Sequence, residues 1–244
     1  MVRVGELNSL INLDKLYENL DINDQIKYIA FGSEKEKGEK FKKIKNPRKN
    51  KVKKHFYNQI TIHIQLEKII NLKIFKNGRI QMTGIKKEKE HSEKTVEILL
   101  NEINHNKFKS EIMNQENLEC LWLKTVLINS DFDMGFKINR ETLHRLIIDR
   151  GYYSSYESCI YPGVNIKYYY NELLNDGGIC NCETVCKGKG LNNECKKITI
   201  AVFNSGKIMI TGGSSSKHIE VGYNFITSFI QENEELIKMN NFDK

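Results

Sequence analysis

Proline, tryptophan and long apolar runs are scarce in this chain of 244 residues, which has two prolines and one tryptophan. No apolar run approaches the ~20 residues that a membrane-spanning helix needs. The first residues, Met1 to Glu6, also lack the apolar core of a signal peptide. With a mean hydropathy of −0.52, the composition predicts a globular protein that stays inside the cell and has no membrane partner.

Motifs that would indicate an enzyme are absent as well. The six histidines show no metal-ligand spacing, and no phosphate-binding loop, Ser-His-Asp order or carboxylate pair stands out. Arginine is also scarce: lysine supplies most of the 38 basic residues and the formal net charge of +7. Lysine favours sequence-independent phosphate contact over bidentate base reading, although a solvated surface is the commoner reason for such a charge. The sequence therefore predicts no enzyme and no required cofactor.

Two stretches of the chain repeat one pattern, Ile74 to Gly84 and Val202 to Gly212. Phe, Gly, Ile, Thr and Gly fall at the same places in both, and Arg79 matches Lys207 in charge. A repeat of this length in a chain of 244 residues indicates one half-unit used twice, not a solenoid of short units.

Both halves, taken as residues 1–110 and 111–244, are expected to run strand, helix, several antiparallel strands, helix. Strict alternation from Tyr57 to Leu66 predicts a half-buried strand, and Asn77-Gly78 is a strong hairpin signal. Two such halves most economically join into one antiparallel sheet with helices on one face, an α+β fold. An open face about ten strands wide needs a partner, which favours a binding protein.

At this point the residues resemble the TATA-box-binding protein (TBP) family, in which the repeated Phe-to-Thr-Gly pattern occurs once per repeat. A second segment, Ser154 to Gly163, resembles the family's Ser-Ser-Tyr-Glu segment leading to Phe-Pro-Gly. The resemblance covers nearly the whole chain, from residue 1 to 237. It implies a saddle of two pseudo-symmetric repeats that form one curved antiparallel sheet with helices on the convex face.

In this family the concave sheet binds the minor groove, and pairs of Phe wedge between base steps, which kinks the duplex by about 80°. The resemblance therefore implies roles for individual residues of this chain. The implied DNA contacts are the wedges Phe75, Phe203 and Tyr161, a fourth wedge at Phe56 or Tyr57, the groove-facing Thr83 and Thr211, and the basic positions Arg79, Lys207, His63 and Lys167.

The chain departs from the family at the centre of the saddle. The family's central Asn pair is missing: Leu127 takes one position, with Asn129 two residues away, and the other falls before Met1. A groove-facing Val is replaced by Gln81 in one repeat and by Met209 in the other. These changes argue against recognition of a standard TATA sequence, while minor-groove binding and bending stay the leading interpretation.

Three functions remain to be compared. The leading hypothesis is a TBP-like transcription initiation factor that binds and bends AT-rich promoter DNA and recruits a factor IIB-like protein or RNA polymerase. The competing hypothesis is a protein-interaction scaffold that has lost DNA binding; a module serving a nuclease or glycosylase ranks last. Coding bias and insertions suggest a large DNA virus or a protist, and therefore a nuclear or a cytoplasmic viral transcription site.

The first of two insertions spans residues 32–54 and is rich in lysine. It has little to bury, so we expect a long mobile loop next to the DNA end. There it would grip flanking phosphates; a solvated loop and a nuclear-import signal are the other interpretations.

The second insertion, residues 171–196, holds four of the six cysteines: Cys180, Cys182, Cys186 and Cys195. Four thiolates satisfy a tetrahedral zinc site. The spacing is not that of a standard finger, so unremarkable thiols and a disulfide pair stay open as alternatives. Cys120 and Cys159, outside the insertion, fit buried small apolar positions.

Overall fold

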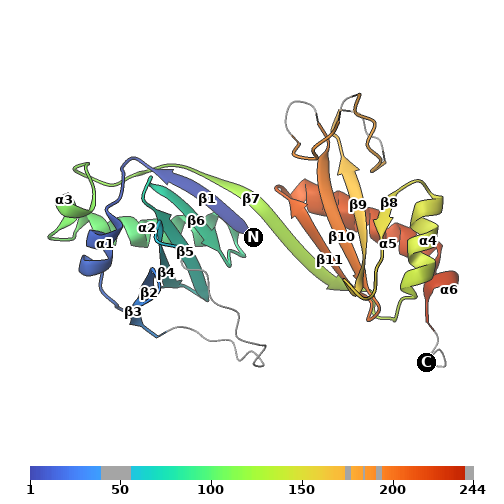
Figure 1. Cartoon of the computed structure of the whole chain (residues 1–244), viewed down its shortest axis with the longest axis horizontal. Coiled ribbons are helices and arrows are strands. Elements are labelled where there is room, and N and C mark those ends of the chain that lie inside the picture. Colours follow the sequence, from blue (N-terminus) through green and yellow to red (C-terminus); the bar gives the residue numbers. More distant parts are fainter. Residues whose placement is uncertain (40–55, 174–176, 184, 191–193, 240–244) are drawn as a thin grey trace. The chain divides into compact units, whose positions relative to one another are not determined.

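The computed structural model describes residues 1–39, 56–173, 177–183, 185–190 and 194–239. The chain forms two compact units, Met1–Val126 and Leu127–Lys244, each with helices against one face of an antiparallel sheet (Figure 1). The predicted α+β class is confirmed by this architecture. Among the described residues, no helix is both long and apolar enough to cross a membrane.

The first unit consists of seven strands, the last of which it shares with the second unit, and three helices. Their bounds are β1 (Val2–Leu7), α1 (Leu13–Asn19), β2 (Ile26–Phe31), β3 (Lys35–Gly38), β4 (Gln59–Gln65), β5 (Ile69–Phe75), β6 (Arg79–Thr83), α2 (Glu88–Asn104), α3 (Lys109–Ile112) and the start of β7 (Cys120–Asp133). The hydrogen-bonded order is β3-β2-β4-β5-β6-β1-β7. In β4, β5 and β6 every second residue is buried, and these aliphatic side chains pack with apolar residues of α1 and α2 into one core.

The second unit repeats this layout. It contains the end of β7, α4 (Arg140–Asp149), β8 (Tyr153–Ser155), β9 (Gly163–Tyr170), β10 (Lys196–Phe203), β11 (Lys207–Gly213), α5 (Ser216–Glu232) and α6 (Glu234–Ile237). The strand order is β7-β11-β10-β9-β8. Alternate residues of β9, β10 and β11 pack with α4 and α5 into a second core, so each sheet has one covered face.

The duplication predicted from the sequence extends to the helix caps. Asn12 caps α1 by accepting a hydrogen bond from the Lys15 N–H, and Asn139 caps α4 by accepting one from the Thr142 N–H. The closing helices α2 and α5 are both 17 residues long. One half-unit has therefore been used twice with its local stabilising interactions retained.

The hairpin glycines Gly78 and Gly206 explain why the repeated pattern contains glycine. Both have positive φ, +78° and +85°, which residues with a Cβ rarely adopt. Their carbonyls accept hydrogen bonds from equivalent donors, Leu7 N–H at 2.9 Å and Met134 N–H at 3.0 Å. A Cβ at Gly206 would also clash with the carbonyl oxygen of Phe136.

This turn gives a stability prediction with a matched control. Gly135 has a similar φ of +80°, but a Cβ there would meet nothing within 4 Å. Gly135→Ala should cost about 1 kcal/mol from the left-handed backbone alone. Gly206→Ala should cost at least about 3 kcal/mol, because the backbone must also move away from the clash. Urea unfolding would measure the loss of unfolding free energy in both variants. Equal losses would contradict the idea that the contact between Gly206 and the Phe136 carbonyl matters.

The prediction of a mobile loop over residues 32–54 is wrong for its first part, because Lys35–Gly38 forms β3 and pairs with β2. The Lys35 ammonium lies 5.3 Å from the centre of the Phe31 ring, and Lys37 donates to the Leu20 carbonyl at 3.0 Å, just beyond α1. These lysines stabilise the fold by cation–π contact and by satisfying a carbonyl at the end of a helix. The remainder of the predicted loop, from residue 40 on, lies outside the described residues.

The two units also divide later than residue 110. The predicted boundary would cut α3, yet the Asn12 N–H donates to the Ile112 carbonyl at 2.8 Å, and Ile11 forms a β-bridge with Met113. Helix α3 therefore packs against the first unit, which extends to Val126.

Candidate nucleic-acid interface

In each unit one face of the sheet is not covered by helices, and we call it the free face. It carries the residues that alternate with the buried core residues, and most of them are half-buried or exposed; Ala201 and Gly163 are buried exceptions. In the first unit these include Thr61, His63, Asn71, Lys73, Phe75, Arg79, Gln81 and Thr83; in the second, Asn165, Lys167, Thr199, Phe203, Lys207, Met209 and Thr211. Every strand residue predicted to contact DNA thus lies on a free face.

An aromatic pair closes one end of the free face in the second unit. The rings of Tyr161 and Phe203 lie 5.8 Å apart, centre to centre, with their planes at 59°. Gly163 is the cross-strand partner of Phe203, and a Cβ there would lie 2.9 Å from Tyr161 and 3.1 Å from Phe203. Glycine at this position therefore leaves room for both rings. The Tyr161 segment is held by Arg140, which donates to the Pro162 carbonyl at 2.5 Å.

At the equivalent end of the first unit, Phe75 lies at the end of β5. Of the two candidates for its partner, Phe56 is 59% exposed. The Tyr57 ring packs on Gly32, and its hydroxyl lies 3.4 Å from the Ser33 oxygen. Among the described residues no second aromatic ring packs on Phe75.

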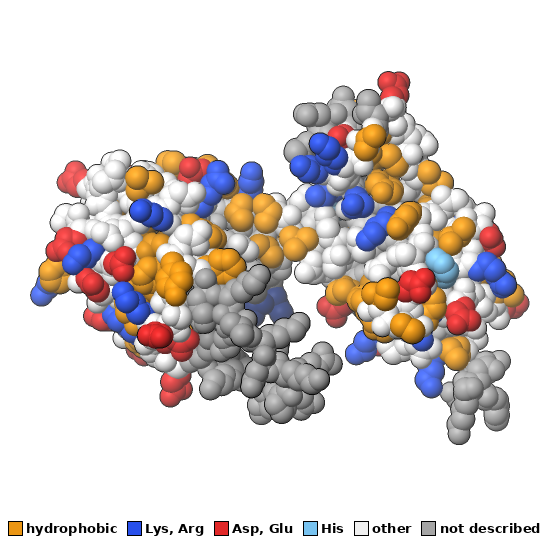
Figure 2. All heavy atoms as spheres, in the orientation of Figure 1, with side chains coloured by type: hydrophobic (Ala, Val, Ile, Leu, Met, Phe, Trp, Pro, Cys, Tyr) orange, Lys and Arg blue, Asp and Glu red, His pale blue; other side chains and the backbone are white. Residues whose placement is uncertain are grey.

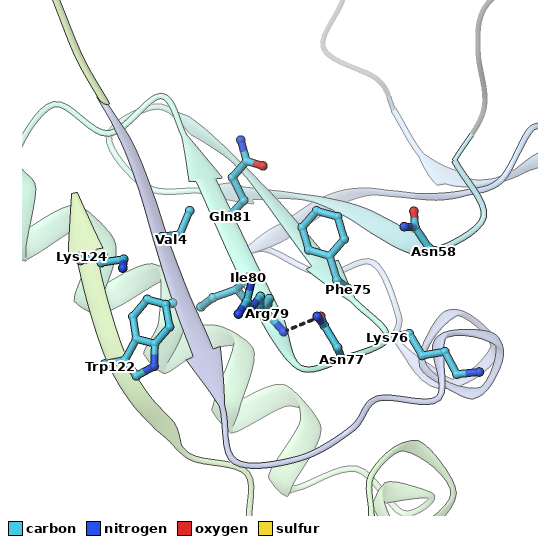
Figure 3. Close-up of a pocket in the computed structure, with 11 residues that line it drawn as sticks. Val4, Asn58, Phe75, Lys76, Asn77, Arg79, Ile80, Gln81, Trp122 and Lys124 are labelled. Carbon is cyan, nitrogen blue, oxygen red and sulfur yellow. Dashed lines mark hydrogen bonds between the residues drawn. The ribbon is translucent and has the colours of Figure 1, made fainter. Parts of the chain in front are cut away.

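Phe75 lines a hollow of about 650 Å³ on the free face of the first unit. Figure 3 shows it between β5 and the start of β7, with Arg79 and Gln81 of β6 and Val4 of β1 also at its wall. Trp122 and Lys124 of β7 form the side away from Phe75. The lining is mostly apolar with basic groups among it, which suits a polyanion that also offers apolar sugar edges.

The sequence reasoning missed Trp122. Its indole N–H donates to a Glu6 carboxylate oxygen at 3.1 Å, and the Lys124 ammonium lies 5.0 Å from the ring centre. The indole is 37% exposed. The sequence does contain a signal for it: Trp122, the only tryptophan of the chain, lies two residues before Lys124 in a strand, and residues two apart in a strand share a face. A lysine beside an aromatic ring on one face is typical of a cation–π contact.

Acidic residues face the predicted basic contacts in both repeats. Arg79 is the cross-strand partner of Glu6, and Lys207 is the partner of Asp133. Each carboxylate reduces the positive potential that its basic partner presents on the free face.

Lys167 and His63, the less certain basic positions, are engaged within their sheets. Burial lowers the pKa of the Lys167 ammonium, nearby Lys197 lowers it further, and the ammonium donates to the Thr199 hydroxyl at 3.0 Å. One ring nitrogen of His63 lies 3.1 Å from the Asn71 side-chain nitrogen, and its ring packs against that of Tyr28 with the ring centres 4.8 Å apart and the planes tilted by 42°.

Comparison with known proteins agrees with this geometry. A family model described as transcription factor TFIID (or TATA-binding protein, TBP) matches residues 124–233. A TATA-box-binding protein-like protein of Acanthamoeba polyphaga mimivirus is 29% identical over 247 residues, which cover 96% of this chain and 64% of the relative. The solved structure of Methanococcus jannaschii TBP matches with a TM-score of 0.55 at 19% identity, over 95% of both chains. The chain is a divergent TBP-like protein.

The predicted resemblance to TBP and the TBP-like α+β fold are therefore confirmed. The family is one of DNA-binding transcription factors, and the mimivirus relative supports the expected origin in a large DNA virus. The family model matches the second repeat and the strand leading into it. The similarity to the mimivirus relative and to the Methanococcus jannaschii structure also covers the first repeat. The chain spans 64% of the length of the mimivirus relative.

The four cysteines of the second insertion come together in this TBP-like protein. The sulfur atoms of Cys180, Cys182, Cys186 and Cys195 all lie within 4.8 Å of one another. Burial, and then the neighbouring Cys182 and Cys180, raise the pKa of the Cys195 thiol well above its ordinary value. The remaining two thiols differ from expectation: Cys120 is half-buried, and Cys159 is exposed because it lies in the turn before β9.

Proposed function

We propose that this TBP-like protein is a transcription initiation factor that binds AT-rich promoter DNA through the minor groove and bends it. The observation that carries the proposal is the position of Phe75 and Phe203 at equivalent strand ends on the free faces. The Phe203 ring also packs against the ring of Tyr161. In this proposal the helices on the covered faces recruit a factor IIB-like protein or RNA polymerase, and the chain has no enzymatic activity.

The residue types support this mode of binding. Flat rings inserted between base steps offset the stacking that is lost when the duplex kinks. Apolar side chains such as Val4 and Met209 would cover sugar edges, and the hydroxyls of Thr83 and Thr211 can donate to minor-groove acceptors. Readout of this kind separates A·T from G·C pairs, and flexible TA steps lower the bending energy.

A second candidate, the scaffold that has lost DNA binding, is favoured by particular residues. Gln81 replaces an apolar side chain on the free face of the first unit, and Glu6 and Asp133 oppose the basic partners described above. In the scaffold hypothesis the same free faces bind protein, and no phosphate contact is formed.

The salt dependence of DNA binding separates the two candidates. For about four phosphate contacts, the affinity for an AT-rich duplex should fall roughly 100-fold between 50 mM and 200 mM salt, because binding releases condensed counterions. Gel shifts across this range give the slope. Lys207→Gln should reduce the slope by about one, whereas Lys109→Gln, on α3, should leave it unchanged. A protein that shifts no duplex even at the lowest salt would favour the scaffold.

A further inference from the structure

The cysteine cluster in the second insertion has the dimensions of a metal site. The sulfur of Cys195 lies 3.5 Å from that of Cys182 and 3.8 Å from that of Cys180. Four sulfurs bound to one zinc with bonds of about 2.3 Å lie roughly 3.8 Å apart at the corners of a tetrahedron. A disulfide would need about 2.05 Å. The observed spacing therefore fits four ligands around one ion.

Three separate passes of the backbone bring these ligands together. Cys195 is fully buried and directly precedes β10. Cys180 follows Gly178, whose carbonyl accepts from the Tyr169 N–H of β9 at 2.9 Å. Cys186 precedes Gly188, whose carbonyl accepts from the Lys197 N–H of β10 at 2.9 Å. Backbone hydrogen bonds thus attach these segments to β9 and β10, and the sheet fixes the positions of the thiols.

Gly188 shows how closely one of these passes approaches the sheet. It has a φ of +69°, and a Cβ there would lie 2.5 Å from the Cβ of Lys197. Only glycine allows both this conformation and this approach. Because Cys186 lies two residues before Gly188, the close approach places its thiol near the other three.

The described residues of the insertion form no apolar core that could hold it in this shape. Its described aliphatic side chains point to solvent: Leu173 is 74% exposed, Val185 is 88% exposed and Ile179 is 38% exposed. A short segment that cannot bury apolar surface needs a covalent or metal cross-link to keep one conformation. The cysteines are the groups present that can supply one.

The charges around the cluster favour a zinc tetrathiolate over free thiols. Four thiolates and one Zn²⁺ carry a net charge of −2. The described residues of the insertion and the start of β10 carry four lysines, Lys187, Lys189, Lys196 and Lys197, against three glutamates, Glu172, Glu183 and Glu194. Figure 2 shows Lys and Arg side chains gathered at this end of the second unit. Their positive charge offsets that of the complex.

We propose that Cys180, Cys182, Cys186 and Cys195 bind one structural Zn²⁺. Each thiol gives up its proton to solvent on binding, and the four sulfur–zinc bonds fill the tetrahedron, so no position is left for a substrate or water. The ion cross-links the insertion to the ends of β9 and β10. A metal cluster with several irons would need the sulfurs further apart than 4.8 Å.

Metal content measured on the full chain, purified without chelators, tests the site. Wild type and the control Cys159→Ser, which changes an exposed thiol outside the cluster, should each hold about one zinc per chain. Cys182→Ser and Cys195→Ser should hold less than about a tenth of that. Zinc-free wild type, or full zinc in both cluster variants, would overturn the proposal.

Cobalt binding by the wild-type chain keeps the test decisive if a cluster variant fails to fold. After removal of zinc, Co²⁺ should give the visible bands of a tetrahedral site and a thiolate-to-cobalt charge-transfer band, and zinc should abolish both. Trypsin cleavage after Lys187 and Lys189 should accelerate at least about tenfold in the metal-free chain. Absence of the cobalt spectrum, or a disulfide in place of two thiols, would refute the site.

The zinc site and the DNA-binding proposal can fail separately. The cluster adjoins the end of β9 and the start of β10, whereas Tyr161 and Phe203 lie at the opposite ends of the same strands. Loss of zinc with bending retained, or the reverse, would therefore be assigned to one proposal alone.

Discussion

A chain in which Phe75 and Phe203 are both alanine should still associate with AT-rich DNA but should no longer kink it. The two rings are the aromatic side chains of the repeated pattern, and alanine cannot replace the stacking that a kink removes. End-to-end fluorescence transfer on a short labelled duplex would measure the bend. We expect wild type to approach the ~80° of the TBP family and the double variant to leave the duplex as straight as free DNA.

Phe108→Ala is the matched control for this experiment. Phe108 is also a large exposed ring, 48% exposed, but it lies beside residues of α1 and α2 such as Glu18 and Asn101. Its loss should leave the bend unchanged. A double variant that bends DNA as strongly as wild type would eliminate the wedge mechanism, even if binding itself were retained.

The single variants should differ, because the two ends are built differently. Phe203 packs with Tyr161, so Phe203→Ala removes one ring of a pair and also loosens the other. Phe75 stands at the wall of the hollow, and no other ring of the described residues packs on it. We therefore expect Phe203→Ala to remove more of the bend than Phe75→Ala.

The covered faces of both sheets could be predicted from the sequence, since their signals are local. Ile60, Ile62 and Ile64 alternate with polar residues, and all three are fully buried in β4. The hairpin at Asn77-Gly78 was visible because its backbone conformation requires glycine. Periodicity and turn chemistry act over a few residues, so a single sequence contains them.

Strand β3 could not be predicted in the same way, because its lysines are held in part by contacts with α1, which is distant in sequence. Lys35 and Lys37 have the composition of a solvated loop, and their partners Tyr17 and Phe31 lie on other elements. The cation–π contacts exist only once α1 and β2 have folded. Composition alone therefore indicated a loop.

The free face was predicted in outline but not in its electrostatics. The family resemblance located Arg79 and Lys207, while the acids opposite them, Glu6 and Asp133, are set by strand register across the sheet. Register depends on pairings between segments far apart in the chain, and single-sequence patterns do not specify it. The four cysteines are a similar case, since their spacing is unusual and their proximity follows from the fold.

Trp122 should report DNA binding to the first unit directly. It is the only tryptophan of the chain, so its fluorescence has a single source. It lies on the wall of the hollow and is 37% exposed. A duplex on the free face would cover the indole, shift its emission to shorter wavelength and reduce quenching by acrylamide at least about twofold.

Trp122→Ala should also weaken DNA binding substantially. Covering the exposed part of the indole buries roughly 80 Å² of apolar surface, which is worth about 2 kcal/mol, or roughly 30-fold in Kd. Fluorescence anisotropy of a labelled duplex would measure this loss. Glu6→Gln is the matched control: it keeps an acceptor for the indole N–H and removes only the carboxylate charge. It should bind DNA at least as tightly as wild type, because the charge that opposes Arg79 is gone. Unchanged quenching at saturating DNA, together with unchanged affinity of Trp122→Ala, would place the DNA on a surface other than this free face.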